Sequence, residues 1–188
     1  MSGANRAVFL DKDGTLVENV PYNVDPQRIT LAPGAVEAVS RLAGQGYRII
    51  VVSNQPGVAL GYFAPSALEG VEHRLEELLP ALDGFYFCPH APGAGCSCRK
   101  PACGMLVRAA EEHGVDLRSS WMVGDILDDV EAGRRAGCRT ILVDNGNETQ
   151  WRLSPERIAH ARVSTLAAAA RVIVSACRRE STASRRTA

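Results

Sequence analysis

Two aspartates near the start of the chain, Asp11 and Asp13, stand two residues apart and directly precede Gly14. A glycine here permits a sharp turn, so both carboxylates can reach one small site. A carboxylate can attack a phosphate ester when a divalent cation absorbs the negative charge of both groups. We therefore assign Asp11 as a nucleophile that forms an aspartyl-phosphate and Asp13 as the general acid and base. Taken alone, an Asp-x-Asp-Gly motif is most often an ordinary turn.

A further carboxylate, Asp125, follows another predicted strand and sets the motif apart from a turn. Together with Asp11 and Asp13 it would form an oxygen-rich site of the kind that Mg²⁺ prefers. Asp128 and Asp129 come shortly after it, and for these two the sequence leaves open a helix N-cap or a first-turn acid as the alternative to a functional role.

Candidate phosphate-binding residues follow two other predicted strands. Ser53 and Asn54 could hold phosphoryl oxygens, although a plain turn remains an equal alternative for Ser53. Lys100 carries a compact ammonium that can neutralise both Asp11 and a phosphate. Its neighbour Arg99 could bind a second anionic group of the substrate.

Three cysteines and one histidine gather in a single segment. Cys88 and His90 are separated by five intervening residues from Cys96 and Cys98, and the four form a closed set of ligands that suits tetrahedral zinc. The set leaves no position for water, so we interpret the zinc as structural. It would hold the loop that carries Arg99 and Lys100. Reduced cysteines that bind no metal are the alternative, and Cys103 is a spare thiol.

The predicted elements place these groups at one edge of a sheet. Apolar runs predict strands at residues 7–10, 48–52, 85–87, 121–123 and 140–143. Apolar residues at three-to-four spacing predict helices at residues 34–42, 66–79, 104–113, 128–136 and 166–177. Their alternation predicts an α/β fold of Rossmann-like type, a parallel sheet with helices on both faces. We expect one domain over residues 1–177, with its zinc loop at 88–98, and a disordered tail over residues 178–188.

Composition excludes some classes of partner. The 188 residues contain 21 Lys and Arg and 21 Asp and Glu, so no basic excess points to nucleic acid. We find no apolar run long enough for a membrane span and no secretion signal. We therefore expect a cytoplasmic protein without a membrane or nucleic-acid partner, and a monomer.

The motifs together resemble those of the haloacid dehalogenase (HAD) superfamily. The matching residues are DKDGT at 11–15, Ser53, Lys100 and GDILDD at 124–129. CPH at 88–90 and CSCRKP at 96–101 are similar to its zinc-containing branch of D-glycero-D-manno-heptose 1,7-bisphosphate 7-phosphatases and histidinol phosphatases. The resemblance implies hydrolysis of the 7-phosphate of this phosphorylated sugar, with Mg²⁺ and Zn²⁺ as cofactors and no large cap domain.

The resemblance also assigns residues. It implies that Asp13 binds Mg²⁺ through its carbonyl, beside Asp11 and Asp125. The implied substrate-binding residues are Asn19, Tyr22, Ser53, Asn54, Gln55, Arg99 and Lys100. Three residues depart from the pattern of the branch, Pro56, Ile126 and Cys103. They affect the expected substrate contacts and leave the catalytic core unchanged.

Three alternatives stay open. A histidinol-phosphate phosphatase shares the catalytic core and the zinc loop, and a polynucleotide 3′-phosphatase shares the aspartate chemistry but needs a basic groove. A zinc-dependent binding module without catalysis is the alternative of another class, and the Asp11 and Asp13 pair argues against it.

Overall fold

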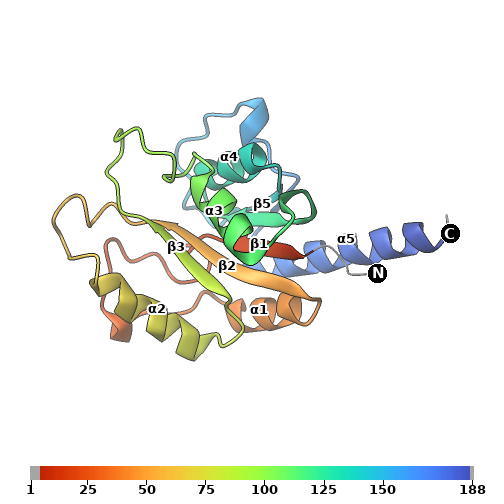
Figure 1. The fold of residues 1–188 in the computed structure, drawn as a ribbon, viewed down its shortest axis with the longest axis horizontal. Coiled ribbons are helices and arrows are strands. Elements are labelled where there is room, and N and C mark those ends of the chain that lie inside the picture. The colour runs from red at the N-terminus through yellow and green to blue at the C-terminus, as the bar shows by residue number, and fades with distance from the viewer. Residues whose placement is uncertain (1–4, 187–188) are drawn as a thin grey trace.

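A computed structural model describes residues 5–186, with side chains as far as residue 179. Its centre is a six-stranded sheet, all parallel, in the order β3-β2-β1-β4-β5-β6 (Figure 1). The strands are β1 (Arg6–Leu10), β2 (Tyr47–Asn54), β3 (Gly84–Cys88), β4 (Trp121–Gly124), β5 (Arg139–Val143) and β6 (Ala161–Val163). The predicted α/β fold is confirmed. Each end of a predicted strand lies within two residues of the corresponding observed end.

Helices cover both faces of the sheet, as Figure 1 shows. They are α1 (Ala35–Ala43), α2 (Ala67–Leu78), α3 (Gly104–His113), α4 (Leu127–Ala136) and α5 (Leu166–Arg186), with short 3-10 turns at Pro26–Arg28, Leu117–Ser119 and Pro155–Arg157. Alternation along β1 divides the core, because Val8 and Leu10 pack with α1, α2 and α5 while Ala7 and Phe9 pack with α3 and α4. This double covering explains why the strands are almost wholly apolar.

The order of the strands reverses between β1 and β4. From β1 the chain builds outward through β2 to β3, then returns to the other side of β1 and builds outward again from β4 to β6. Ligand sites in open parallel sheets lie beyond the carboxyl ends of the strands at such a reversal. Asp11 and Asp125 follow the two strands that flank it.

Two elements differ from the sequence-based expectation. The edge strand β6 was not predicted, because it has three residues and alternates in exposure instead of forming an apolar run. Helix α5 continues to Arg186, whereas the predicted helix ends at Cys177 and is followed by a disordered tail. No glycine or proline stands between these positions to stop the helix, which explains the extension. Residues 187 and 188 of the expected tail lie outside the described residues, and the domain boundary at Cys177 stays a prediction.

Within residues 5–186, the segments that join β1 to α1 and β2 to α2 are loops and short turns instead of a second domain. The expectation of a fold without a large cap is confirmed. None of the helices in this range combines the length and the apolar character that crossing a bilayer requires.

Candidate active site and metal centres

Two carboxylates that follow β1 and β4, and a third from the first turn of α4, meet at the reversal point. The backbone N–H of Asp11 donates to the carbonyl of Val123 at 2.9 Å, which continues the pairing of β1 with β4 to the predicted nucleophile. Carboxylate oxygens of Asp11, Asp125 and Asp129 lie within 4.8 Å of one another, and all three residues are buried. The structure therefore brings Asp11 and Asp125 together as the sequence predicts, and adds Asp129.

Lys100 lies between two of these carboxylates. Its Nζ is 2.5 Å from Asp11 Oδ1 and 2.6 Å from Asp129 Oδ1, and it also donates to the carbonyl of Val52 at 2.9 Å. The side chain is 2% exposed. Burial alone would lower the pKa of Lys100, but Asp11 and Asp129 outweigh it and the net shift is upward. The ammonium thus stays protonated beside Asp11.

The pKa values of the carboxylates show why this site favours a cation. Burial raises the pKa of Asp11 well above its usual value, Lys100 lowers it, and Asp129, Asp125 and Asp13 raise it further. Burial and then Asp129 raise the pKa of Asp125 to about 6. A divalent cation among these oxygens would relieve the repulsion, and hard oxygen donors are what Mg²⁺ requires. The donor set therefore fits magnesium.

Asp13 lies beside this group and has its own partners. Lys12 Nζ is 2.5 Å from Asp13 Oδ1, and the Gln55 side-chain amide donates to Asp13 Oδ2 at 2.9 Å and to Ser53 Oγ at 2.9 Å. The carboxylate of Asp13 is thus absent from the described carboxylate cluster. Binding of a cation through its main-chain carbonyl stays a prediction. Gln55, expected at the substrate, directly holds the predicted general acid.

The Asn54 side chain has a structural partner. Its Nδ2 donates to the Lys100 carbonyl at 3.1 Å, and its Oδ1 accepts from the Lys100 N–H at 3.0 Å. This reciprocal pair fixes the backbone that delivers the lysine to Asp11, so the Asn54 side-chain amide is already occupied. Arg99 is partly buried, and its guanidinium donates to the His90 carbonyl at 3.2 Å. Whether it also binds substrate stays a prediction.

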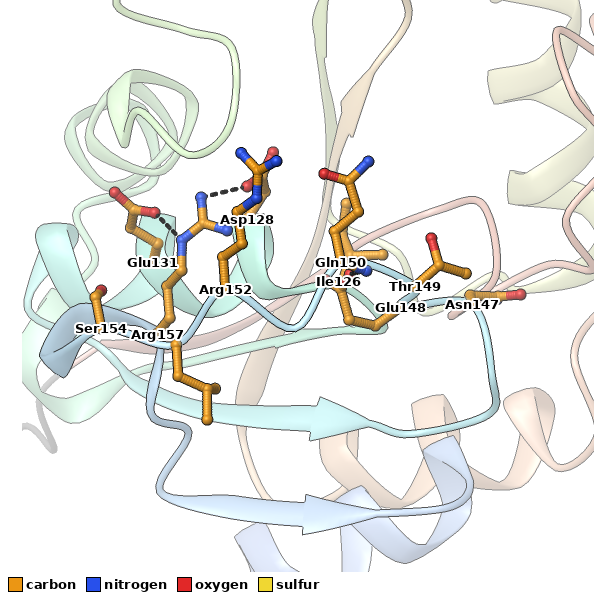
Figure 2. A pocket seen from close by; sticks show the side chains of 11 residues that line it. Ile126, Asp128, Glu131, Asn147, Glu148, Thr149, Gln150, Arg152, Ser154 and Arg157 are labelled. Carbon is orange, nitrogen blue, oxygen red and sulfur yellow. Dashed lines mark hydrogen bonds and ion pairs between the residues drawn. The ribbon is translucent and has the colours of Figure 1, made fainter.

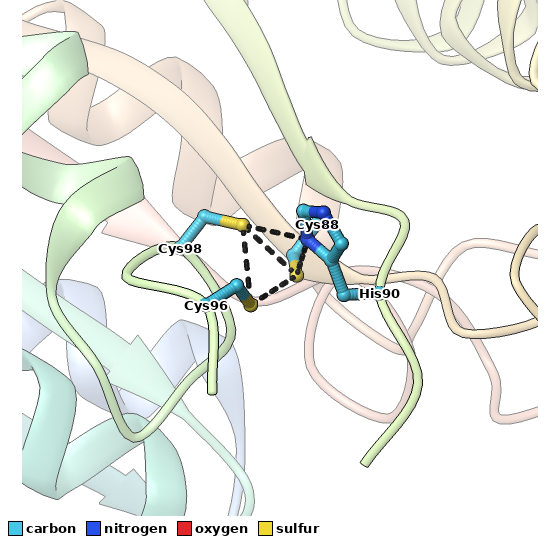
Figure 3. A group of neighbouring side chains, drawn as sticks. All are labelled: Cys88, His90, Cys96 and Cys98. Atoms are coloured by element: carbon cyan, nitrogen blue, oxygen red, sulfur yellow. Dashed lines mark hydrogen bonds between the residues drawn. The ribbon is translucent and has the colours of Figure 1, made fainter. Parts of the chain in front are cut away.

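The cysteine and histidine cluster is assembled as the spacing predicts (Figure 3). Cys88 Sγ lies 3.7 Å from Cys96 Sγ and 3.1 Å from Cys98 Sγ, Cys96 Sγ lies 3.6 Å from Cys98 Sγ, and His90 Nδ1 lies 3.2 Å from Cys98 Sγ. Four ligands at tetrahedral zinc with arms of roughly 2.3 Å are separated by about 3.7 Å. The four side chains therefore fit one metal ion, and Cys103 is absent from the cluster.

Known proteins match most of this chain. The HAD-hydrolase-like family model matches residues 97–169. A D-glycero-β-D-manno-heptose-1,7-bisphosphate 7-phosphatase of Pseudomonas aeruginosa is 38% identical over 144 residues, covering 74% of this chain and 81% of the relative. A D-glycero-D-manno-heptose-1,7-bisphosphate 7-phosphatase of Thermosynechococcus vestitus is 43% identical, covering 74% of this chain and 79% of the relative. The chain belongs to this heptose-bisphosphate phosphatase family.

Solved structures agree with the membership. A D,D-heptose 1,7-bisphosphate phosphatase from B. bronchiseptica, complexed with magnesium and phosphate, superposes with a TM-score of 0.80 at 30% identity and covers 91% of this chain and 98% of that one. The corresponding protein of Burkholderia thailandensis superposes with a TM-score of 0.62 at 25% identity, covering 91% of this chain and 99% of that one. The predicted membership of the HAD superfamily is thus confirmed.

Two residues expected at the substrate of this heptose-bisphosphate phosphatase family lie on an exposed loop. Asn19 is exposed, and Tyr22 is 49% exposed with a left-handed backbone (φ 56°). Tyr22 packs edge-on against Tyr62 at 4.8 Å between ring centroids. Among the described residues, no hydrogen bond, ion pair or ring contact joins Asn19 or Tyr22 to Asp11 or Asp13, so their role stays a prediction.

Sequence reasoning on this family member left several site residues without a role. Asp129 is fully buried, and the carboxylate pairs with Lys100 while Oδ2 accepts from the Ile126 N–H at 3.2 Å. Its place four residues after Asp125, in the first turn of the predicted helix, is the sequence signal that could have identified it. A pocket of about 710 Å³ is lined by the first turns of α4 and by residues of the loop after β5, Asn147 and Gln150 among them (Figure 2). Its lining does not include Asp11, Asp13, Asp125 or Lys100.

Proposed function

We propose that the protein is a Mg²⁺-dependent phosphatase that removes the 7-phosphate of D-glycero-D-manno-heptose 1,7-bisphosphate through an aspartyl-phosphate on Asp11. The observation that carries the proposal is the contact of Asp11 with Lys100 beside Asp125, at the reversal point of the sheet. The named activity of the curated relatives, at 38% and 43% identity, supports the choice of substrate.

The first step transfers the phosphoryl group to the protein. An oxygen of Asp11 attacks phosphorus while the bond from phosphorus to the sugar oxygen breaks, and Asp13 gives its proton to that oxygen. Lys100 neutralises charge on Asp11 and on the phosphoryl oxygens during the transfer. The low exposure of Lys100 strengthens this effect, because water does not screen it.

The second step returns the protein to its starting state. The carboxylate of Asp13 takes a proton from water, the water oxygen attacks phosphorus, and the bond to Asp11 breaks with release of inorganic phosphate. Lys12 and Gln55 bind the two oxygens of Asp13 and limit its movement between these tasks. Ser53 is linked to the same network, because its Oγ accepts from Gln55, and its hydroxyl would donate to a phosphoryl oxygen.

Two metal ions belong to the proposal. Asp11 and Asp125, with the main-chain carbonyl of Asp13, would hold Mg²⁺, which supplies charge neutralisation to the nucleophile and the phosphate when bound. Cys88, His90, Cys96 and Cys98 would hold Zn²⁺ as a structural ion, because four protein ligands leave no open position for catalysis.

The zinc site supports a location in a reducing compartment, since thiolate ligands must escape oxidation. We therefore include a cytoplasmic location in the proposal, with the phosphorylated sugar as the partner, no nucleic acid or membrane, and a monomeric protein. Size-exclusion chromatography with light scattering tests the last point, and a dimer would contradict it.

The test of the function is phosphate release from heptose 1,7-bisphosphate and from histidinol phosphate, with and without Mg²⁺. We expect wild-type protein to prefer the heptose bisphosphate, and Asp11→Asn to release no phosphate from either. Glu37→Gln is the matched control, because it removes an exposed carboxylate on α1 whose ion-pair partner is Arg41 of the same helix. Preference for histidinol phosphate would replace the substrate, and activity that survives Asp11→Asn would refute the aspartyl-phosphate.

A further inference from the structure

The segment that follows β5, residues 145–148, contacts both motifs that supply the candidate Mg²⁺ ligands. Asn145 Nδ2 donates to the carbonyl of Gly14 at 2.6 Å, in the turn after the nucleophile. Asn147 Nδ2 donates to Asp125 Oδ2 at 2.7 Å. Glu148 Oε2 accepts from the Leu127 N–H at 2.8 Å, at the first residue of α4. The segment therefore ties the turn after β1 to the turn after β4.

Asn147 fixes one of the two oxygens of Asp125. The other oxygen, Oδ1, accepts from Thr15 Oγ1 at 3.2 Å, so both ends of the carboxylate are bound by side chains. A carboxylate oxygen has lone pairs for a hydrogen bond and a metal ion together. These hydrogen bonds can thus orient the Asp125 carboxylate and still leave lone pairs for a metal ion.

The contact between Asp125 and Asn147 is tightly packed against Gly14. A methyl group placed on Gly14 would lie 2.2 Å from Asp125 Oδ2 and 2.4 Å from Asn147 Nδ2. Gly14 has φ of +90°, which an L side chain rarely adopts. Gly14 therefore leaves room for the pair formed by Asp125 and Asn147. This pair packs against the turn that presents Asp13.

We propose that Asn147 is a positioning residue that orients Asp125 for Mg²⁺, with residues 145–148 holding the β1 and β4 motifs together around the ion. The inference rests on the Mg²⁺ site of the proposed function. Residues that orient a metal ligand commonly change metal affinity by about 10–100-fold when they are removed. Asn147 acts through Asp125 and has no part in bond breaking.

The experiment measures Mg²⁺ binding to the full chain, with its zinc site loaded and no substrate present, by isothermal titration calorimetry. Asn147→Leu keeps the branched shape of the side chain and removes the N–H donor, and we expect its Kd for Mg²⁺ to rise about 10–100-fold. Gln150→Ala is the matched control, because it truncates an exposed amide side chain three residues away and should keep the wild-type Kd. Asn147→Ala takes the place of the leucine variant if that variant does not fold.

The form of the change separates positioning from general damage. Loss of positioning weakens Kd at an unchanged stoichiometry, whereas partial unfolding lowers the stoichiometry and leaves Kd alone. A wild-type Kd in a folded Asn147 variant would overturn the proposal, as would a wild-type protein that binds no Mg²⁺. If the Asn147 variant binds Mg²⁺ more weakly and wild-type protein releases no phosphate from heptose bisphosphate, the positioning role is supported and only the substrate is rejected.

Discussion

Replacement of Asp125 by asparagine should make the Mg²⁺-free protein more stable relative to wild type as the pH rises. Burial and the neighbouring Asp129 raise the pKa of Asp125 to about 6, from a usual value of 3.8. Between these two pH values the folded protein holds a proton that the unfolded chain has lost, so the stability of wild type falls as pH rises through this window. The asparagine variant has no such proton at this position, so it lacks the part of the fall that Asp125 causes.

The size of the effect follows from the shift. A change from 3.8 to about 6 corresponds to about 3 kcal/mol of folding free energy at pH values above both. Between about pH 5 and about pH 8, on the order of 1–2 kcal/mol of this loss should be visible. Loss of the Asp125 charge also removes one of the causes that raise the pKa of Asp11, which acts in the same direction.

Urea denaturation followed by circular dichroism, at about pH 5 and about pH 8 in Mg²⁺-free buffer, measures the difference in unfolding free energy between variant and wild type. The comparison across pH cancels any constant cost of the lost hydrogen bonds from Asn147 and Thr15. Glu37→Gln removes a carboxylate that is 61% exposed and should show no such dependence on pH. A difference that stays constant or shrinks as pH rises would refute a buried, mutually repelling group of carboxylates.

Three further changes test other parts of the site. Lys100→Met should lower kcat about 10²–10³-fold, because it removes the charge that stabilises the transferring phosphoryl group, and steady-state phosphate release measures this. Cys98→Ser should release the zinc and lower kcat about 10–100-fold, since Lys100 lies two residues further along the same loop, as metal analysis and phosphate release would show. Gly14→Ala should destabilise the fold by about 1–3 kcal/mol through its positive φ and the clash with Asp125, and an unchanged Tm would contradict the crowding.

The sequence predicts the parts of the site that depend on strand ends. Asp11 and Asp125 each follow an apolar run, and parallel strands bring their carboxyl ends to one edge of a sheet. The cysteine and histidine cluster is also predictable, because its four ligands lie within eleven residues and zinc geometry restricts how they can meet. Local spacing and the regular geometry of the sheet are sufficient in both cases.

The parts that sequence does not predict depend on loops and on partners that are distant in the chain. Asn147 contacts Asp125 across 22 positions, and Gln55 contacts Asp13 across 42. No periodicity specifies such contacts, because the loop conformations that produce them arise from tertiary packing. The end of α5 was misplaced for a related reason, since the sequence after Cys177 lacks both a clear stop signal and an apolar stripe.

The charge of the site explains why it should be both unstable when metal-free and selective for a divalent ion. When ionised, Asp11, Asp125 and Asp129 carry three negative charges against the single ammonium of Lys100, which leaves two in a buried space. Burial makes this imbalance costly, and the raised pKa values of Asp11 and Asp125 are its signature. A divalent cation removes the imbalance, so the same repulsion that lowers stability increases affinity for Mg²⁺. Substitutions that stabilise the Mg²⁺-free protein by removing one of these carboxylates should therefore weaken the binding of Mg²⁺.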